Sequence, residues 1–471
     1  MKSRNQHTLI SISMVIYCVF NSFIAVGQNG FANHWHINHN MHVDFSLGGP
    51  FVDTLSELNT FESSISYSNT DGELLFYSNG GAIPTYEASG GYLWNRNHEV
   101  MPNGILVDTM GCQSSSNGGI VIPDFTDDNI FWVFTSDCSE THTLAPEQHI
   151  GLRSTKIDMS LDGGLGDVLE KGVPIYGDSS HKFDEGIGAT RHANGVDYWI
   201  IMHGYNYPLS DTFYVFLFNE SGVSPPIVQT IGSTIEGKIE ISPNGKHMTY
   251  GNEFYTFDKA SGVISSPINL DINLVSSSFS PDSRFLYTVD AHNLYQYDCS
   301  SPDLLASRIL VYHASDEPVY EFGGMQLGPN CKIYVARLEH SSFGVINLAN
   351  EPGLACNYVH NQLMHGLPYW LNAIWFPNYI DSEFACETVT IEEIDKDYFL
   401  LTQATDGQSI RLSFNPKRAS DTIMIFDATG RLIGQYIATN NNTEIDISNF
   451  SDGVYVVNIP GINQSQKFLK F

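Results

Sequence analysis

The chain has 471 residues, with 52 acidic side chains against 22 basic ones and a formal net charge of −30 at pH 7. A charge of this sign repels phosphate backbones, so we expect no nucleic acid as a partner. The length allows more than one domain. The acidic residues are expected to keep the surface soluble. A Ca²⁺ site is the more specific alternative, and we expect no other cofactor.

Residues 1–27 have the pattern of a secretory signal peptide. Lys2 and Arg4 precede an apolar run from Leu9 to Phe20, and the small residues of Ala25-Val26-Gly27 offer a cleavage point. No later apolar run reaches the roughly 20 residues that a membrane helix needs. We therefore expect an exported mature chain without a transmembrane segment.

A histidine-rich stretch follows the signal peptide. His34 and His36 are two residues apart, so in a strand both side chains lie on one face, at a spacing that can ligate Zn²⁺. His39 and His42 could join them only if the strand bends, and no carboxylate or Cys arrangement fixes a fourth ligand. We favour a strand without metal, and a metal site is the alternative.

A second candidate for metal binding is an acidic, glycine-rich loop. Asp158, Asp162 and Asp167 supply the oxygen ligands that Ca²⁺ prefers, and three glycines allow unusual backbone angles. The spacing differs from that of an EF-hand. A plain loop between strands is the favoured interpretation, with Ca²⁺ as the alternative.

A repeated turn organises the chain from residue 241 onward. Ile241–Tyr250, Phe279–Tyr287 and Leu327–Val335 each place Pro and then Asn or Asp between apolar runs, which predicts strand, tight turn and strand. The prolines lie 38 and then 48 residues apart. This spacing is typical of β-propeller blades, whose periods are about 40–50 residues.

The same strand-like pattern extends back toward the N-terminus, for example in Asp71–Tyr77 and Asn129–Thr135. With a period of about 50 residues, residues 28–380 predict roughly seven blades. A closed ring must join its first and last blades. We expect the strand near Val43-Asp44-Phe45 to complete the blade that contains Trp370–Phe376.

The pattern changes after residue 380. An acidic linker is expected at residues 381–394, and short strands separated by polar turns fill residues 395–471. These strands predict a small Ig-like β-sandwich. The whole chain is therefore expected to be all-β.

Six cysteines remain of the seven once Cys18 of the signal peptide is removed. An even count in an exported protein favours disulfides, although six cysteines allow fifteen pairings. We favour the three sequential pairs, which are Cys112–Cys138, Cys299–Cys331 and Cys356–Cys386. The absence of C-x-x-C gives no support to a zinc knuckle.

The C-terminal unit resembles the type A sorting domain of type IX secretion system cargo. The resemblance is carried by Ile425–Ile433, Ile445–Ile459 and the basic terminus Lys467–Phe471. It implies recognition by the type IX secretion machinery. It also implies that the chain, after removal of its signal peptide, is secreted or reaches the outer cell surface.

Residues 35–377 resemble exported propellers that occur with such sorting domains, including gliding-motility-associated proteins. Leu74–Gly80, His98–Gly104 and Tyr198–His203 carry this resemblance, and the repeated turns are similar to those of TolB-type propellers. The TolB-type resemblance implies a protein-binding scaffold, whereas the gliding-motility group implies no settled activity.

We therefore expect a binding or scaffold protein whose loops hold a protein or glycan, and we favour this over an enzyme. The alternative is an extracellular, glycosidase-like hydrolase in the propeller channel. Its acid–base candidates are Asp184 and Glu185, near His181 and Arg191, and Trp94 is the best candidate for a sugar platform. No G-x-S-x-G nucleophile motif occurs, and no residue is assigned a catalytic role.

Overall fold

The computed structural model divides the chain into two compact units, Met1–Thr388 and Val389–Phe471. The described residues are 30–46, 49–60, 62–82, 90–106, 111–138, 151–177, 182–205, 210–232, 237–314, 321–338, 340–365, 375–386, 399–403, 408–414, 422–438, 442–459 and 465–470. The expected signal peptide lies outside them.

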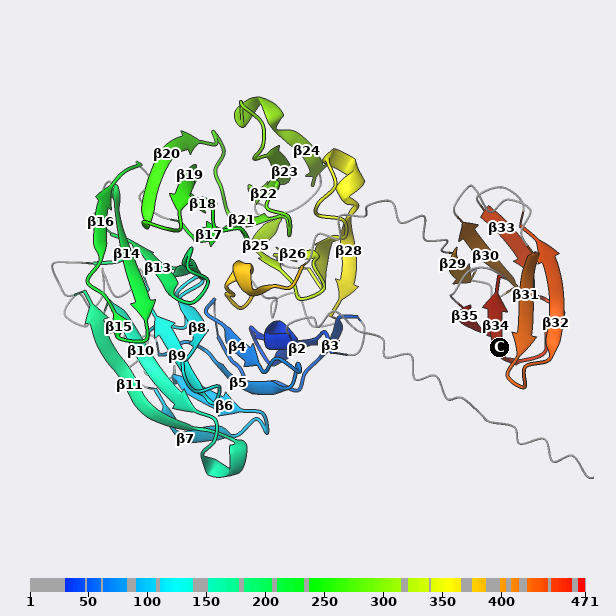
Figure 1. Cartoon of the computed structure of the whole chain (residues 1–471), viewed down its shortest axis with the longest axis horizontal. Coiled ribbons are helices and arrows are strands. Elements are labelled where there is room, and N and C mark those ends of the chain that lie inside the picture. Colours follow the sequence, from blue (N-terminus) through cyan, green and yellow to red (C-terminus); the bar gives the residue numbers. More distant parts are fainter. Residues whose placement is uncertain are drawn as a thin grey trace, which may run out of the picture. The chain divides into compact units, whose positions relative to one another are not determined.

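The first unit is a β-propeller of seven antiparallel sheets in the described residues, as the repeat predicted (Figure 1). The first four sheets are β1 (His34–Ile37), β2 (Met41–Asp44) and β3 (Phe51–Asp53); β4 (Ile65–Ser68), β5 (Leu74–Ser78), β6 (Tyr92–Asn95) and β7 (Val100–Ile105); β8 (Gly119–Pro123), β9 (Ile130–Thr135), β10 (Leu152–Asp158) and β11 (Asp167–Tyr176); and β12 (Gly188–Arg191), β13 (Tyr198–His203), β14 (Thr212–Asn219), β15 (Gly222–Val223) and β16 (Ile227–Thr230). The last three are β17 (Ile239–Ile241), β18 (His247–Tyr250), β19 (Glu253–Asp258) and β20 (Val263–Asn269); β21 (Ser276–Phe279), β22 (Phe285–Val289), β23 (Asn293–Asp298) and β24 (Ile309–His313); and β25 (Phe322–Leu327), β26 (Ile333–Arg337), β27 (Ser342–Ile346) and β28 (Tyr358–Met364).

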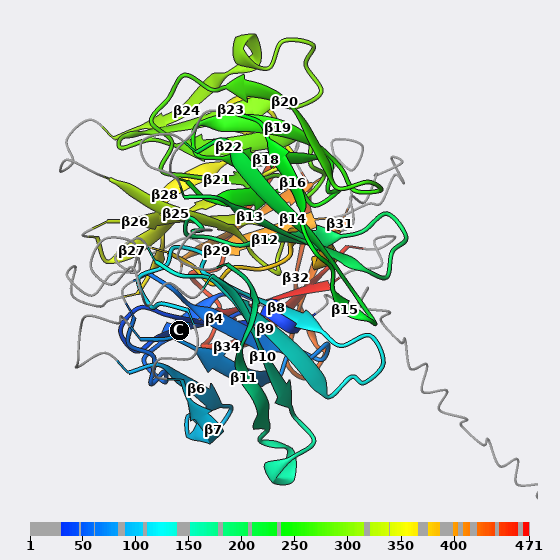
Figure 2. The same ribbon diagram turned by 90° about the vertical axis from the view of Figure 1, so that its left-hand side faces the viewer.

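Each sheet is a meander that starts at the centre of the ring and runs outward. The first strand of a sheet contacts the first strand of the next, as β12 contacts β17 and β21 contacts β25. Figure 2 shows these stacked sheets from the side. The helices of the described residues are short 3₁₀ turns, namely η1 (Gly30–Ala32), η3 (Asp162–Gly164), η4 (Leu305–Ser307), η5 (Gly353–Cys356) and η7 (Asp381–Glu383). None of these helices is long and apolar enough to cross a membrane.

The repeated turns are built by the side chains that the sequence repeats. Ser242 Oγ accepts a hydrogen bond from the backbone N–H of His247, the first residue of β18 (3.0 Å). Asn244 Oδ1 accepts one from the backbone N–H of Lys246 (2.9 Å). Ser280 and Asp282 make the same two bonds before β22, at 2.8 and 3.0 Å. The turn chemistry is therefore local, which is why it is visible in the sequence.

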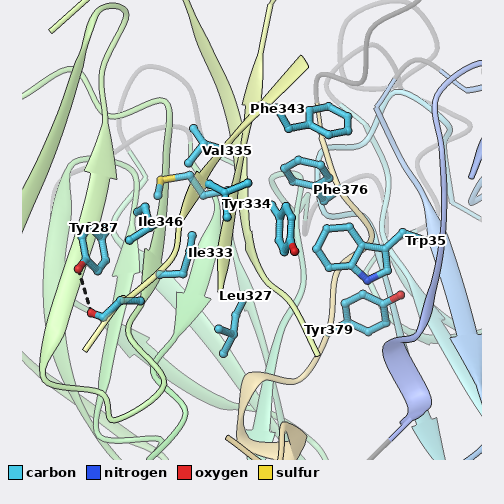
Figure 3. Close-up of a cluster of buried hydrophobic side chains, with 14 of the residues drawn as sticks. Trp35, Tyr287, Leu327, Ile333, Tyr334, Val335, Phe343, Ile346, Phe376 and Tyr379 are labelled. Atoms are coloured by element: carbon cyan, nitrogen blue, oxygen red, sulfur yellow. Dashed lines mark hydrogen bonds between the residues drawn. The ribbon is translucent and has the colours of Figure 1, made fainter. Parts of the chain in front are cut away.

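Aromatic side chains join the first sheet to the last (Figure 3). Trp35 of β1 is buried, and its ring centroid lies 5.3 Å from those of Tyr334 and Phe376. Phe45, which follows β2, also contacts Tyr334, at 5.4 Å. These rings belong to one core cluster that spans the seam of the ring.

The strand exchange that we expected at the seam of the ring stays a prediction, because most of its second segment lies outside the described residues. The strand β2 pairs with β1 and β3 in a sheet of its own. Phe376 contacts Trp35 of β1 and shares a core cluster with Val43 and Phe45, while the expected partner residues 370–374 lie outside the described residues. Aromatic packing therefore holds the described part of the seam together.

Two disulfides are present in the described residues. Cys112 pairs with Cys138 as predicted, with a Cα–Cα distance of 5.6 Å. The expected pairs Cys299–Cys331 and Cys356–Cys386 are wrong, because Cys331 pairs with Cys386 (Cα–Cα 5.5 Å) and the other two thiols are not in disulfides. Folding brings the turn after β25 beside residue 386, a long-range contact that sequential order does not show.

The second disulfide can be tested by replacing Cys331 and Cys386 with Ser together. The bond closes a loop of 55 residues, so we expect the free energy of unfolding of the propeller to fall by about 4 kcal/mol on chain-entropy grounds. Thermal or denaturant unfolding measures the change, and Cys299→Ser is the matched control. A peptide linking Cys299 to Cys331 in a mass-spectrometric map would contradict the pairing.

The second unit is a small two-sheet β-sandwich, as predicted. Its sheets are β29 (Phe399–Gln403), β30 (Ser409–Phe414) and β33 (Asn442–Asp446), and β32 (Leu432–Ile437), β31 (Thr422–Asp427), β34 (Gly453–Asn458) and β35 (Ser465–Lys470). Ile410 and Ile445 from one sheet and Ile425 and Val457 from the other share one buried core. The basic terminus pairs as the edge strand β35 on β34.

Candidate binding site at the mouth of the channel

Residues 375–386, here called the channel segment, run through the centre of the ring (Figure 1). Near its start, Asn378 Nδ2 donates a hydrogen bond to the backbone oxygen of Ile187 (2.7 Å). Near its end, the Glu383 carboxylate accepts two hydrogen bonds from Arg191, at 2.7 and 2.6 Å. Because Ile187 precedes β12 and Arg191 ends it, the segment crosses the channel from one end to the other.

A buried carboxyl pair lies in the middle of the channel segment. Asp381 faces Glu240 of β17, and Gln326 Nε2 donates to Asp381 Oδ1 (3.2 Å). Glu240 Oε1 and Asp381 Oδ2 have no partner among the described residues. Burial raises the pKa of both carboxyls, to about 7 for Asp381, so a proton held between them supplies the missing hydrogen bond. Residues 381–386, expected in the linker, thus belong to the channel.

A cavity of about 180 Å³ opens at the end of the ring where the inner strands begin. This mouth cavity is lined by loops that lead into the third to sixth sheets, together with the first residue of the channel segment. Its walls include Ser116, Asp184, Glu185, Lys238, Leu274 and Trp375. The channel segment follows Trp375 into the ring, so the cavity is approached from one side.

Two buried nitrogen donors meet in the mouth cavity. Lys238 Nζ lies over the ring of Trp375. In the described part of the chain, neither Lys238 Nζ nor Trp375 Nε1 has a hydrogen-bond partner. Burial lowers the pKa of Lys238 well below its usual value, while the nearby carboxylates of Glu62, Glu185 and Glu240 oppose that shift.

Two of these carboxylates are positioned by one serine. The Ser116 backbone N–H donates to Glu185 Oε2 (3.0 Å), and the Ser116 hydroxyl donates to Glu62 Oε2. A carboxylate has about four acceptor positions, so each can accept further hydrogen bonds. The mouth cavity therefore combines nitrogen donors with carboxylate acceptors.

The structure separates the residues of the proposed acid–base group. Asp184 is buried and accepts hydrogen bonds from the Tyr250 hydroxyl (2.6 Å) and the Gly237 N–H (3.0 Å), and burial raises its pKa to about 7. Arg191 lies at the opposite end of β12, paired with the channel segment. His181 lies outside the described residues. Of the described members of this group, Asp184 and Glu185 line the mouth cavity and Arg191 does not.

His34 and His36 share one face of β1, as predicted, and join a stack of rings between the first two sheets. The ring order is His34, His42, His36, Tyr77 and Trp94, with centroid separations of 5.1, 4.6, 3.9 and 5.3 Å. Burial lowers the pKa of His36 well below its usual value. Trp94 is buried in this stack, so the expectation of a sugar platform there is wrong.

The acidic loop forms an ordinary hairpin turn. Asp158 and Asp167 face each other across β10 and β11, and Asp162 begins η3. Asp158 Oδ1 accepts hydrogen bonds from Ser160, and Asp167 Oδ1 accepts one from Asn103 (2.9 Å). Within the described ranges, no three His, Cys, Asp or Glu side chains gather as they would around a metal ion.

Lys238 and Trp375 were not among the residues that the sequence singled out. Lys238 precedes a short strand in an acidic chain and looks like a solvated charge, and Trp375 sits in an apolar run that suggests blade core. The one available signal is the rarity of basic residues, 22 in 471. Lys238 and Trp375 come into contact because of the path of the channel segment, and no local sequence pattern predicts that path.

The comparison with protein families identifies the second unit. Residues 405–470 match the family described as the secretion system C-terminal sorting domain. The second unit is thus the sorting domain of a type IX secretion cargo, and the chain is directed to export by that system. This bears out the resemblance carried by the C-terminal motifs.

Solved structures with distant likeness to the chain include the Dos1 propeller (11% identity, TM-score 0.41, covering 82% of this chain and 89% of that one) and a functionally unknown protein from Desulfotomaculum acetoxidans (13%, 0.36, 83% and 98%). The Cps50 (Swd1) propeller domain of Myceliophteria thermophila is another (10%, 0.35, 66% and 95%). No curated protein sequence matches the chain. None of these likenesses bears on activity.

The carboxyl pair makes the stability of the propeller depend on pH. The pKa of Asp381 in the folded chain is about 7, above its value of about 4 in an unfolded chain, so its contribution is complete below about pH 4 and is lost as the pH rises through 7. Asp381→Asn keeps the shape and removes this titration. Between about pH 5 and 8 we expect the wild type to lose about 3 kcal/mol more than the variant.

Unfolding free energies of the two proteins across this pH range measure the difference, and Asp128→Asn, at an exposed turn, is the control. Parallel pH profiles of the wild type and Asp381→Asn would show that the pair is not buried as described.

Proposed function

We propose that this chain is an exported binding protein, secreted or displayed at the cell surface, whose mouth cavity holds part of a protein or glycan. A signal peptide at residues 1–27 would carry it across the inner membrane, and the sorting domain would direct it across the outer one. The propeller is then the functional unit, and the C-terminal domain is a sorting signal for export.

The path of the channel segment is the observation that carries this proposal. It fills the ring through Asn378 and Glu383, which contact the blade of β12, and through Asp381, which faces β17 and β25 of two other blades. The segment leaves room for a ligand at the mouth, where Lys238 and Trp375 present buried polar atoms without hydrogen-bond partners in the described residues. Ligand sites are concave and hold a few placed polar groups of this kind.

A hydrolase is the second candidate, because Asp184 has a pKa raised to about 7 and lines the same cavity as Glu185. A general acid must reach the bond that it protonates. The carboxyl of Asp184 is instead held by Tyr250 and Gly237, which gives it a structural role in joining two blades. Binding therefore accounts for more of the cavity than catalysis does.

The sorting role of the C-terminal domain is tested by deleting residues 395–471. We expect the truncated chain to accumulate in the periplasm, because the sorting signal is lost while the propeller keeps its own core. Cell fractionation measures the distribution, and the Cys331–Cys386 disulfide in the retained protein shows that the propeller has folded. Undiminished surface display or secretion of the truncated chain would refute the sorting role of residues 395–471.

The binding site is tested by filling the mouth cavity with Leu274→Trp. Leu348→Trp, at an exposed leucine outside the cavity, is the matched control. The labelled proteins are applied to an array of glycans and peptides. We expect the wild type and the control to be retained on at least one probe, and retention of Leu274→Trp to fall at least about tenfold, a loss of about 1.4 kcal/mol.

Recovery of the bound probe by mass spectrometry separates the two candidate functions. An unchanged probe supports binding. Cleavage by the wild type that is lost in Glu185→Gln would instead favour the hydrolase, and full retention of Leu274→Trp on every probe would contradict a site in the mouth.

A further inference from the structure

The polar atoms of the mouth cavity specify what kind of ligand fits it. Lys238 Nζ and Trp375 Nε1 are buried donors without partners among the described residues. An unsatisfied buried donor costs about 1–3 kcal/mol. Both residues line the same cavity, so a ligand with oxygen acceptors at this place would satisfy both donors at once.

The same cavity also presents acceptors to a ligand. Glu185 lines the wall, and Glu62 reaches the same serine, Ser116, from the other side. Carboxylates accept hydrogen bonds and donate none when ionised. A hydroxyl group both donates and accepts, so a ligand that carries several hydroxyl groups matches donors and acceptors that lie side by side.

Charge favours a neutral ligand over an anionic one. One lysine faces the carboxylates of Glu62, Glu185 and Glu240, and the whole chain carries a net charge of −30. Phosphate, sulfate or a further carboxylate would meet a negative potential in this cavity. A cationic ligand would be placed against Lys238.

Size and shape point to a single ring. The volume of about 180 Å³ is below the ~300–1,000 Å³ of sites for drug-sized ligands. Leu274 and Val275 add apolar wall, which suits the C–H face of a sugar. The channel segment blocks any deeper path, so only the end of a chain can enter.

We propose that the mouth cavity binds the neutral terminal monosaccharide of a glycan, with Lys238 and Trp375 donating to its oxygens and Glu185 accepting from its hydroxyl groups. This assignment rests on the proposed binding function and names its ligand class. The sugar is held end-on, and internal residues of the glycan remain outside the cavity.

The test uses the full chain and calorimetric or saturation-transfer NMR titration with methyl glycosides of glucose, galactose and mannose, and with methyl glucuronide as the anionic probe. We expect at least one neutral glycoside to bind with a dissociation constant on the order of 1 mM, equivalent to about −4 kcal/mol. We expect the glucuronide to bind at least about tenfold more weakly.

Two variants remove one donor each. Lys238→Met keeps the volume and removes the amine, and Trp375→Phe keeps an aromatic ring and removes the N–H. Each is expected to weaken binding of the neutral glycoside about tenfold, whereas Lys246→Met, at an exposed turn, leaves it unchanged. The melting temperature of each variant shows whether it is folded, so weaker binding by a folded variant reports the lost donor.

Each outcome decides the proposal. Absence of binding to all three neutral glycosides, tighter binding of the glucuronide, or unchanged binding in folded Lys238→Met and Trp375→Phe would overturn it. If peptide probes alone are retained, and Leu274→Trp releases them, the sugar assignment fails while the binding function stands. If Leu274→Trp releases no probe, the binding function itself fails.

Discussion

The propeller depends on how its central channel is filled. Seven sheets that meet around an axis leave inner strands whose side chains need partners, and the channel segment supplies them. Arg191 is paired with Glu383, and Glu240 with Asp381 through a shared proton. Buried charges of this kind contribute little net stability, but each is costly to leave alone. The segment and the ring therefore require each other.

The same arrangement gives the mouth cavity its inner wall. The channel segment places Trp375 beside Lys238 at one end and is fixed at the other end by the Cys331–Cys386 disulfide. An enzyme in an open propeller channel needs access along the axis, whereas a binding protein needs only a rigid rim. A filled channel is compatible with a binding protein and leaves little room for an active site within the channel.

The sequence predicted those parts of the structure that are set by local chemistry. The Ser-Pro-Asn and Ser-Pro-Asp turns recur because Ser242, Asn244 and their counterparts bond their own backbone, so the blade period could be read directly. The C-terminal motifs predicted the sorting domain because they too are short stretches of contiguous sequence. The signal for Cys112–Cys138 was also short-range, since only 26 residues separate the two cysteines.

Non-local contacts account for what could not be predicted. Asp381 and Glu383 resemble linker residues, because their partners lie in β17 and β12, far away in the sequence. Cys331 finds Cys386 only after the channel segment has crossed the ring. Lys238 looks solvated until Trp375 is placed against it. The candidate site therefore emerges from the path of one segment without secondary-structure periodicity.

Hydrogen–deuterium exchange of residues 375–386 in the full chain tests this account most directly. If the segment fills the channel, its buried amides should exchange as slowly as those of the inner strand β12, and Asp381→Asn should retain that protection. Exchange as fast as that of the exposed turn at residues 126–129 would contradict the account, because the channel would then be open and the mouth cavity would lose its inner wall.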